Sequence, residues 1–241
     1  METDRVWIQD CEYALKKAEA PLIIKPKDIN LVFDFDGVIT QPQDLKASIL
    51  QQMGYDITPE QTDKQNAHKL MLQQKPQKGM EGIKNDYEAM IHQLYVKRMF
   101  EVPPEKDAID VLRRLKDSEK YYMFIVTSRR ASEEKPEIQA AGEWLRMHSL
   151  KFDAVINTNN QSKKEDLKQL KPVIYVDDSA GKIYNIFEDP EKCTKLDPAL
   201  TNTFLALFRQ KANHHINPKG LVKTIEHGWR ELESKIYSLT K

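Results

Sequence analysis

Short apolar runs alternate with stretches of helical periodicity over most of the chain. The apolar runs that predict strands lie at 31–35, 121–126, 152–156 and 172–176. Between them, apolar residues recur near a 3.6-residue period, which predicts helices around 108–115, 138–147 and 162–170. Strands that alternate with helices in this way build βαβ units. We therefore expect an α/β fold with a Rossmann-like parallel sheet.

The pattern changes between residues 44 and 100, where polar helices with one apolar face replace the strands. One helix is expected to close at Gly54, and Thr58-Pro59-Glu60 is expected to open a second, because a capping residue precedes a proline there. The third helix has the strongest apolar face, made of Ile83, Tyr87, Met90, Ile91, Leu94, Tyr95 and Met99. We interpret 44–100 as an inserted helical cap, with this face as its interior.

The two ends of the chain are predicted to be helical. Residues 4–20 carry apolar side chains at helical spacing and stop at Pro21, so 1–28 is expected to hold an accessory helix. A helix around 182–187 and a short strand near 193–196 would finish the sheet, and 200–208 and 221–239 are predicted as helices. The predicted organisation is an accessory helix in 1–28, a core in 29–43 and 101–198, a cap in 44–100 and carboxyl-terminal helices in 199–241.

Composition narrows the class of protein. Among 241 residues, 40% are hydrophobic and 31% are charged, which is typical of a soluble globular chain, and no run of about 18 apolar residues predicts a membrane span. Basic and acidic residues number 37 each, so extended nucleic-acid binding is not expected. Two cysteines and an amino terminus without a secretory signal favour a cytoplasmic location.

Oxygen-bearing side chains follow three of the predicted strands. They are Asp34 and Asp36, Thr127 and Ser128, and Asp177 and Asp178. The carboxyl ends of parallel strands share one edge of a sheet, where ligands bind. Carboxylates gathered there need a positive partner, and Mg²⁺ prefers carboxylates together with water and phosphate oxygens. Lys163 and Lys164 precede the last of these strands and are placed to complete the charge balance.

Four motifs in this order resemble those of the haloacid dehalogenase (HAD) superfamily. They are Asp34-Phe35-Asp36-Gly37-Val38, then Thr127, then Lys163, and then the pair Asp177-Asp178, and together they cover roughly 30–196. The helical insertion between the first two motifs is similar to a type-one cap of that superfamily. One departure is that no aspartate follows a few residues after Asp178, so both acids of the pair are expected to serve the metal.

The resemblance implies a magnesium-dependent phosphatase that acts through an aspartyl-phosphate. Asp34 would attack phosphorus, while Asp36 would protonate the leaving oxygen and then activate water. The metal ligands would come from Asp34, Asp178 and the backbone carbonyl of Asp36, with Asp177 bound directly or through water. An acid at position 36 also favours phosphate over halide chemistry.

The remaining site residues implied by the resemblance bind the phosphoryl group. Thr127 would donate a hydrogen bond to its oxygens, and Lys163 would offset their charge. Ser128 and Lys164 are the neighbouring alternatives for these two roles. The candidates for a second anionic group of the substrate, or else for a solvated basic loop, are Arg129 and Arg130.

Three functions agree with these features. The first is hydrolysis of a small phosphorylated metabolite or nucleotide, because the tract from 127 to 145 and the paired acids resemble nucleotidase and polynucleotide-phosphatase relatives. The second is a protein phosphatase acting on phosphotyrosine, which an open cap would favour. The third is a non-catalytic binding or regulatory module, which the intact Asp34 and Asp36 oppose.

Overall fold

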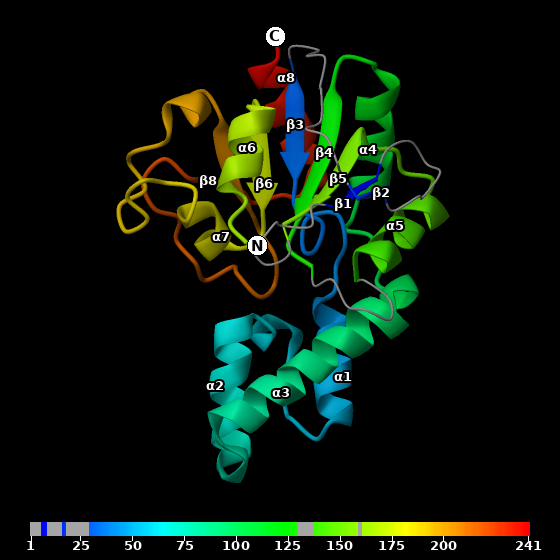
Figure 1. Cartoon of the computed structure of the whole chain (residues 1–241), viewed down its shortest axis with the longest axis vertical. Coiled ribbons are helices and arrows are strands. Elements are labelled where there is room, and N and C mark those ends of the chain that lie inside the picture. Colours follow the sequence, from blue (N-terminus) through cyan, green and yellow to red (C-terminus); the bar gives the residue numbers. More distant parts are fainter. Residues whose placement is uncertain (1–5, 9–15, 18–28, 130–136, 159–160) are drawn as a thin grey trace.

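An eight-stranded sheet forms the centre of the described chain. The computed structural model of the protein describes residues 6–8, 16–17, 29–129, 137–158 and 161–241. Its strands are β1 (Val6–Ile8), β2 (Lys16–Lys17), β3 (Asn30–Phe33), β4 (Tyr122–Thr127), β5 (Ala154–Asn157), β6 (Ile174–Asp177), β7 (Phe204–Phe208) and β8 (Lys223–Ile225). They lie in the order β2-β1-β5-β4-β3-β6-β7-β8, parallel from β5 to β8 and antiparallel at β1 and β2. The predicted parallel α/β sheet is confirmed, with β3 near its middle (Figure 1).

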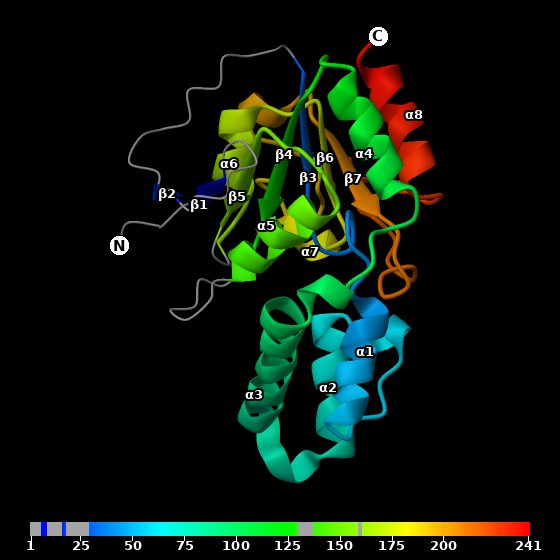
Figure 2. The same cartoon turned by 90° about the vertical axis from the view of Figure 1, so that its right-hand side faces the viewer.

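Helices cover both faces of this sheet. They are α4 (Ala108–Asp117), α5 (Glu137–Met147) and α8 (Trp229–Leu239) on one face, and α6 (Lys164–Leu170) and α7 (Ala180–Tyr184) on the other. Figure 2 shows α4 and α8 side by side, with α6 across the sheet from them. Along β3, Leu31 and Phe33 pack into the first layer and Val32 into the second. This alternation buries the strand on both faces, which explains its unbroken apolar sequence.

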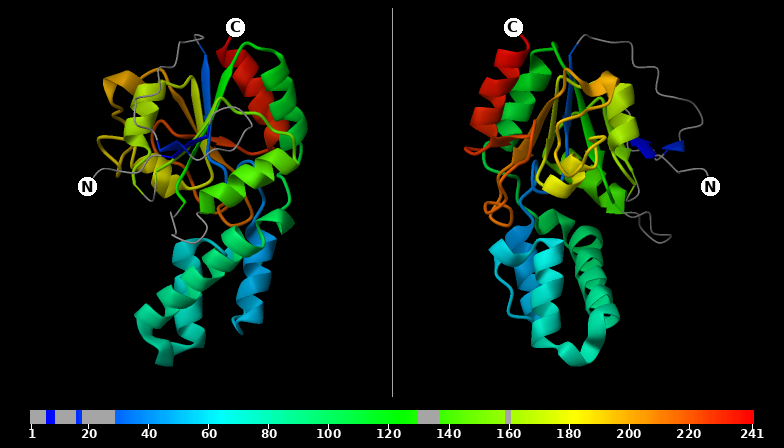
Figure 3. Two further views of the ribbon diagram at one scale, coloured as in Figure 1. Left: turned by 45° about the vertical axis from the view of Figure 1, so that its right-hand side comes forward. Right: turned by 90° about the vertical axis from the view of Figure 1, so that its left-hand side faces the viewer.

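The inserted segment forms a helical lobe beyond the carboxyl edge of the sheet, as Figure 1 and Figure 3 show. It contains α1 (Gln43–Gln52), α2 (Lys64–Gln74), α3 (Gly79–His92), a π-helical turn at Gln93–Lys97, and 3-10 turns at Pro59–Gln61, Pro76–Lys78 and Met99–Glu101. The helical cap is confirmed, but Thr58 begins only a 3-10 turn. The second helix begins at Lys64, where Asp63 Oδ1 accepts a hydrogen bond from the Asn66 amide at 3.1 Å. The helix begins five residues later than predicted because Asp63, and not Thr58, supplies the cap for the continuous helix.

The chain enters and leaves the cap at neighbouring points. The Gln41 amide donates to the Pro103 carbonyl at 2.9 Å, and the Glu105 amide donates to the Ile39 carbonyl at 2.8 Å. Thr40 and Pro104 form an isolated bridge between these two bonds. The two connections are therefore tied to each other on the core side of the cap.

The ends of the chain differ from the prediction. Val6–Ile8 and Lys16–Lys17 are strands at the sheet edge, not parts of a helix, and the rest of the predicted accessory helix lies outside the described residues. The predicted helix over 200–208 is wrong, because Phe204–Phe208 is β7, preceded by a 3-10 turn at Pro198–Leu200.

Two further predictions near the carboxyl terminus need correction. No strand forms at 193–196, since the described sheet is extended by β7 and β8 instead. The predicted helix over 221–239 is correct only for α8, because β8 occupies its first part. Among the described residues, no helix combines the length and the apolar character needed to cross a membrane.

Candidate active site

A tight turn after β3 carries the first two aspartates. Asp34 directly follows the strand and is buried, and Asp36 lies two residues further on at the cavity wall. Gly37 has a φ of 77°, and a Cβ on it would lie 2.0 Å from Asp178 Oδ2. Glycine is therefore required twice, for the left-handed backbone and for the close approach of Asp178.

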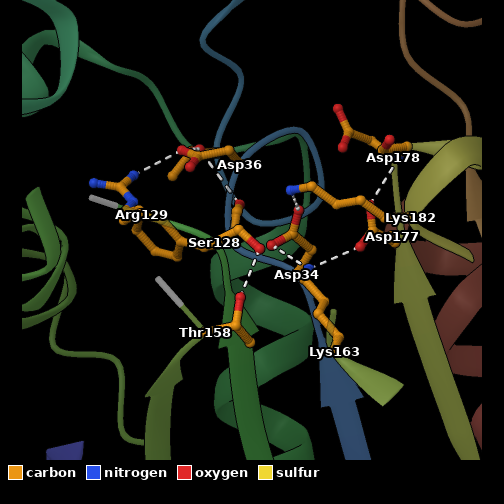
Figure 4. Close-up of polar contacts among 12 residues, drawn as sticks. Asp34, Asp36, Ser128, Arg129, Thr158, Lys163, Asp177, Asp178 and Lys182 are labelled. Carbon is orange, nitrogen blue, oxygen red and sulfur yellow. Dashed lines mark hydrogen bonds and ion pairs between the residues drawn. The ribbon is translucent and has the colours of Figure 1, made fainter. Parts of the chain in front are cut away.

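Lys163 joins two of the strand ends. Its Nζ lies 2.9 Å from Asp34 Oδ1 and 2.7 Å from Asp177 Oδ2 (Figure 4). The Tyr175 hydroxyl donates to the same oxygen of Asp177, while the Ser179 amide donates to Asp177 Oδ1 at 2.8 Å. Both carboxylate oxygens of Asp177 are thus engaged by protein groups. This geometry selects Lys163 over its half-exposed neighbour, residue 164, as the lysine of the site.

A second lysine, which was not among the predicted site residues, approaches Asp34. Lys182 on α7 places Nζ 3.7 Å from Asp34 Oδ2. Burial alone would raise the pKa of Asp34, but Lys163 and Lys182 outweigh it and lower that pKa. Burial opposes the charge of Lys182 in turn, and the nearby aspartates overcome this and raise its pKa. Asp34 is consequently held as a carboxylate. The sequence does contain a signal for Lys182, because it lies four residues after Asp178, about one helical turn, and can therefore face the same side as Asp178.

The acidic cluster has the composition of a cation site. Asp34, Asp177 and Asp178 each offer an oxygen within 4.8 Å of the others. Burial, Asp177 and Asp34 raise the pKa of Asp178 to about 8, because the nearby lysines offset only part of the negative charge. A divalent cation would relieve this repulsion. Asp177 accepts hydrogen bonds on both oxygens, whereas Asp34 Oδ2 has only the longer contact of 3.7 Å with Lys182 Nζ, so this oxygen and Asp178 are better placed for a hard ion such as Mg²⁺.

The two hydroxyl candidates at the carboxyl end of β4, Thr127 and Ser128, differ in their exposure to the cavity. Thr127 is the last residue of the strand and is buried. Ser128 lines the cavity, and its Oγ lies 2.8 Å from Thr158 Oγ1. The geometry therefore favours Ser128, the alternative, as the hydroxyl that faces a ligand.

Arg129 lies in a different place from the one expected. Its side chain is 1% exposed, and its Nη2 lies 2.7 Å from Asp36 Oδ1. Its Nη1 donates to the Glu137 carbonyl at 3.0 Å, and its guanidinium lies 4.9 Å from the Phe35 ring centre and 4.4 Å from that of Tyr95. Arg129 is neither a solvated loop residue nor part of the cavity wall, so the predicted contact with a second substrate anion is not supported. Arg130 lies outside the described residues.

A cavity of about 460 Å³ separates the sheet edge from the cap. Its core side is formed by Asp34, Asp36, Ser128, Glu137, Asp178 and Lys182. The side chains that reach it from the cap include Lys46, Lys64, His68, Lys84, Tyr87 and Tyr95. The three cap lysines are not identifiable from the sequence, because their relevance depends on how α1, α2 and α3 are rotated toward the core. The two tyrosines belong to the apolar face predicted as cap interior, and in the structure they also line the cavity.

Comparisons with known proteins agree with this arrangement. The family model for haloacid dehalogenase-like hydrolases matches residues 31–183, more than half of the chain. A predicted phosphatase from Clostridium acetobutylicum has a similar fold, with 14% identity, a TM-score of 0.51, and coverage of 87% of this chain and 98% of that one. A haloacid dehalogenase-like family protein from Streptococcus pneumoniae has 13% identity, a TM-score of 0.50, and coverage of 88% and 99%. A comparison with curated proteins finds no match. With its motifs gathered at one sheet edge beneath a helical cap, the chain belongs to the haloacid dehalogenase-like hydrolases.

Proposed function

We propose that the protein is a magnesium-dependent phosphomonoesterase that acts through an aspartyl-phosphate on a small phosphorylated metabolite or nucleotide. The observation that carries this proposal is the state of Asp34. It is buried at the base of the cavity and held ionised by Lys163 and Lys182. A carboxylate kept charged in this way is a nucleophile rather than a general acid.

The other carboxylate of the turn is placed for proton transfer. Asp36 faces the cavity, and Arg129 and Thr40 both contact its Oδ1, at 2.7 and 3.4 Å. In the first step Asp34 forms a bond to phosphorus and the bond from phosphorus to the leaving oxygen breaks. Asp36 enters this step protonated on Oδ2, with Oδ1 on Arg129, and gives its proton to the leaving oxygen. In the second step Asp36 takes a proton from water, which attacks phosphorus and releases Asp34.

The charge on the phosphoryl oxygens is met from several sides. Lys163 and Lys182 supply positive charge beside Asp34, and Ser128 supplies a hydroxyl donor at the cavity wall. A magnesium ion held by Asp34, Asp178 and the backbone carbonyl of Asp36 would neutralise the remaining charge of substrate and carboxylates. Asp177 would orient Lys163 from the side.

The cap limits the size of the substrate, which favours a small molecule. A cavity of about 460 Å³ walled by α1, α2 and α3 lies in the size range of small-molecule sites. A folded phosphoprotein would need the cap to swing away, so hydrolysis of protein phosphotyrosine is the weaker alternative. A non-catalytic module would not need the ionised Asp34 opposite Asp36. A cytoplasmic location remains a prediction of the sequence.

Substitution of each aspartate separately tests the mechanism. Asp34→Asn should abolish phosphate release from p-nitrophenyl phosphate, because the nucleophile is lost. Asp36→Asn should still allow attack on this activated ester but should not activate water, so the phosphorylated enzyme should accumulate. Intact-mass measurement should show one added phosphoryl group that hydroxylamine removes, located on Asp34. A phosphorylated serine, histidine or cysteine, or unimpaired turnover by Asp34→Asn, would overturn the mechanism.

A further inference from the structure

The cap end of the cavity carries positive charge that the proposed phosphoryl chemistry does not use. We propose that the substrate bears a second anionic group, a carboxylate or a further phosphoryl group, which binds Lys64 and Lys84 while its scissile phosphoryl group lies at Asp34. This inference rests on the proposed function and specifies its substrate class.

Helix geometry directs both lysines toward the cavity. On α2, Lys64 and His68 are four residues apart and therefore share one side of the helix. On α3, Lys84 shares a side with Glu88 and Ile91, again at spacings of four and three residues. All five residues line the same cavity. The two lysines therefore lie on cavity-facing sides of neighbouring helices.

The lysines of the core and those of the cap differ in their partners. Lys163 and Lys182 both form ion pairs with Asp34, whereas within the described residues neither Lys64 nor Lys84 has an ion pair. Glu88 is the carboxylate that the described cap contributes to the cavity wall. Two lysines against one carboxylate leave this end of the cavity positive.

His68 adds a polar group near the two charges. Burial, followed by repulsion from Lys64 and Lys84, lowers the pKa of His68, so both lysines lie within its electrostatic reach. Its ring packs edge-on against Tyr87 at 4.7 Å, and its buried Nε2 has no hydrogen-bond partner among the described residues. This end of the cavity therefore holds an imidazole nitrogen whose hydrogen bond the described protein groups do not supply.

The polarity of the cavity therefore selects among phosphate esters. Its core end holds the reacting phosphoryl group, and its cap end offers two ammonium groups and an imidazole. An ester with an uncharged tail leaves these cations without a partner, whereas a tail ending in an anion pairs with them. Since Lys64 and Lys84 are themselves exposed, salt should weaken this preference.

Matched substrates and variants test the inference. We would measure kcat/KM with Mg²⁺ for 6-phosphogluconate against glucose 6-phosphate, for 3-phosphoglycerate against glycerol 3-phosphate, and for fructose 1,6-bisphosphate against fructose 1-phosphate. The variants are Lys64→Gln, Lys84→Gln and the double variant. Lys69→Gln is the matched control, because Lys69 is an exposed lysine of α2 outside the cavity wall. Thermal unfolding would confirm that each variant is folded.

The wild-type protein should prefer at least one doubly anionic substrate about tenfold or more over its matched partner. Each lysine substitution should lower kcat/KM for that substrate about tenfold, mainly through KM, as expected for a lost charged hydrogen bond. Turnover of p-nitrophenyl phosphate should stay within about twofold, and Lys69→Gln should change neither value. The kind of preferred probe distinguishes a carboxylate from a phosphoryl group.

Two results would overturn the inference. One is an equal kcat/KM of the wild-type protein for the two substrates of every matched pair, including the case in which the protein hydrolyses only phosphopeptides. The other is an equal loss for singly and doubly anionic substrates in the variants, since that would indicate a general attraction of phosphate. The tail preference must also weaken at high salt.

Calorimetry separates a failure of this inference from a failure of the proposed function. If no ester releases phosphate, the proposed function is wrong, and binding of 4-phosphonobutyrate against butylphosphonate with Mg²⁺ decides the inference. Tighter binding of the carboxylated phosphonate that the double lysine variant loses would support the second anion site. Equal binding of the two phosphonates would overturn it.

Discussion

Replacement of Arg129 by methionine should destabilise the protein strongly, although Arg129 is placed to bind neither metal nor phosphate. Methionine keeps much of the side-chain length but removes the charge that lies 2.7 Å from Asp36 Oδ1. It also removes the hydrogen bond to the Glu137 carbonyl and the cationic contacts with the rings of Phe35 and Tyr95. The substitution thus leaves Asp36 without its positive partner.

The expected magnitude follows from burial. Loss of one partner of a buried ion pair typically costs about 3–5 kcal/mol. The Asp36 side chain is 18% exposed, so water can solvate part of the freed charge and the lower end of that range applies to the pair itself. The two cation–π contacts add about 0.5–1 kcal/mol each. The total is about 4–5 kcal/mol, and in a chain of this size each kcal/mol shifts Tm by about 2–4 °C, so a fall of roughly 8–20 °C is expected.

Thermal and urea unfolding followed by circular dichroism would measure the change. Arg113→Met is the matched control, because Arg113 is exposed and its Nη2 donates to the His148 carbonyl at 2.7 Å, and its loss should cost about 0.5 kcal/mol or less. Combination with Asp36→Asn should recover about 1–3 kcal/mol of the sum of the single effects, since the pair is already broken. Strict additivity, or a Tm within 2 °C of the wild type for Arg129→Met, would refute the role of the pair.

Three further predictions concern the catalytic centre. Gly37→Ala should abolish phosphate release and lower Tm, because the added methyl group would collide with Asp178. Gly181→Ala should be tolerated, because its methyl group would meet no atom within 4 Å. Equal effects of the two substitutions on phosphate release and on Tm would contradict this prediction. Lys163→Met should lower kcat about 100-fold or more, because Lys163 pairs with the buried Asp34 and Asp177. Lys164→Met should leave kcat within about twofold. A larger loss of kcat in Lys164→Met than in Lys163→Met would mean that the wrong lysine was chosen. Chelation should stop turnover, and Mg²⁺ should raise Tm more at pH 8 than at pH 5. The folded metal-free protein retains a proton on Asp178 up to about pH 8, whereas the unfolded chain loses it near pH 4, so the stability of the folded protein should fall as the pH rises between these values. Full activity in excess chelator would count against a cation at this site. So would an effect of Mg²⁺ on Tm that does not change with pH.

The site residues that could be predicted from the sequence lie at the ends of strands, because the end of a parallel strand determines where its side chains lie. Asp34 and Asp177 each follow or close a buried apolar run, and parallel strands bring such positions to one edge whatever the details of packing. Lys163 was identifiable for a related reason, because it directly precedes a helix that leads into β6. The choice between Lys163 and residue 164 needed the structure, because a shift of one residue turns a side chain away from Asp34 and Asp177, which Lys163 contacts at 2.9 and 2.7 Å.

The parts that were not predictable depend on contacts between distant segments. Arg129 pairs with Asp36 across 93 positions, and nothing near either residue in the sequence indicates that the other is its partner. Phe204–Phe208 is a continuous apolar run without alternation, so its period cannot distinguish a buried parallel strand from a buried helix. Lys64 and Lys84 acquire their significance only when α2 and α3 are oriented over the sheet edge.

The paired connections at Gln41 and Pro103 have a consequence for how the fold can diversify. Since a hydrogen bond of 2.9 Å already joins the points where the cap leaves and rejoins the core, the inserted segment closes a loop whose ends are fixed by the sheet. The entropy of closing such a loop grows only with the logarithm of its length. A cap of different length and sequence can therefore occupy the same insertion point with little effect on how Asp34 is presented. Recombination at these two positions should exchange the side chains that the cap contributes to the cavity while keeping Asp34 at the end of β3.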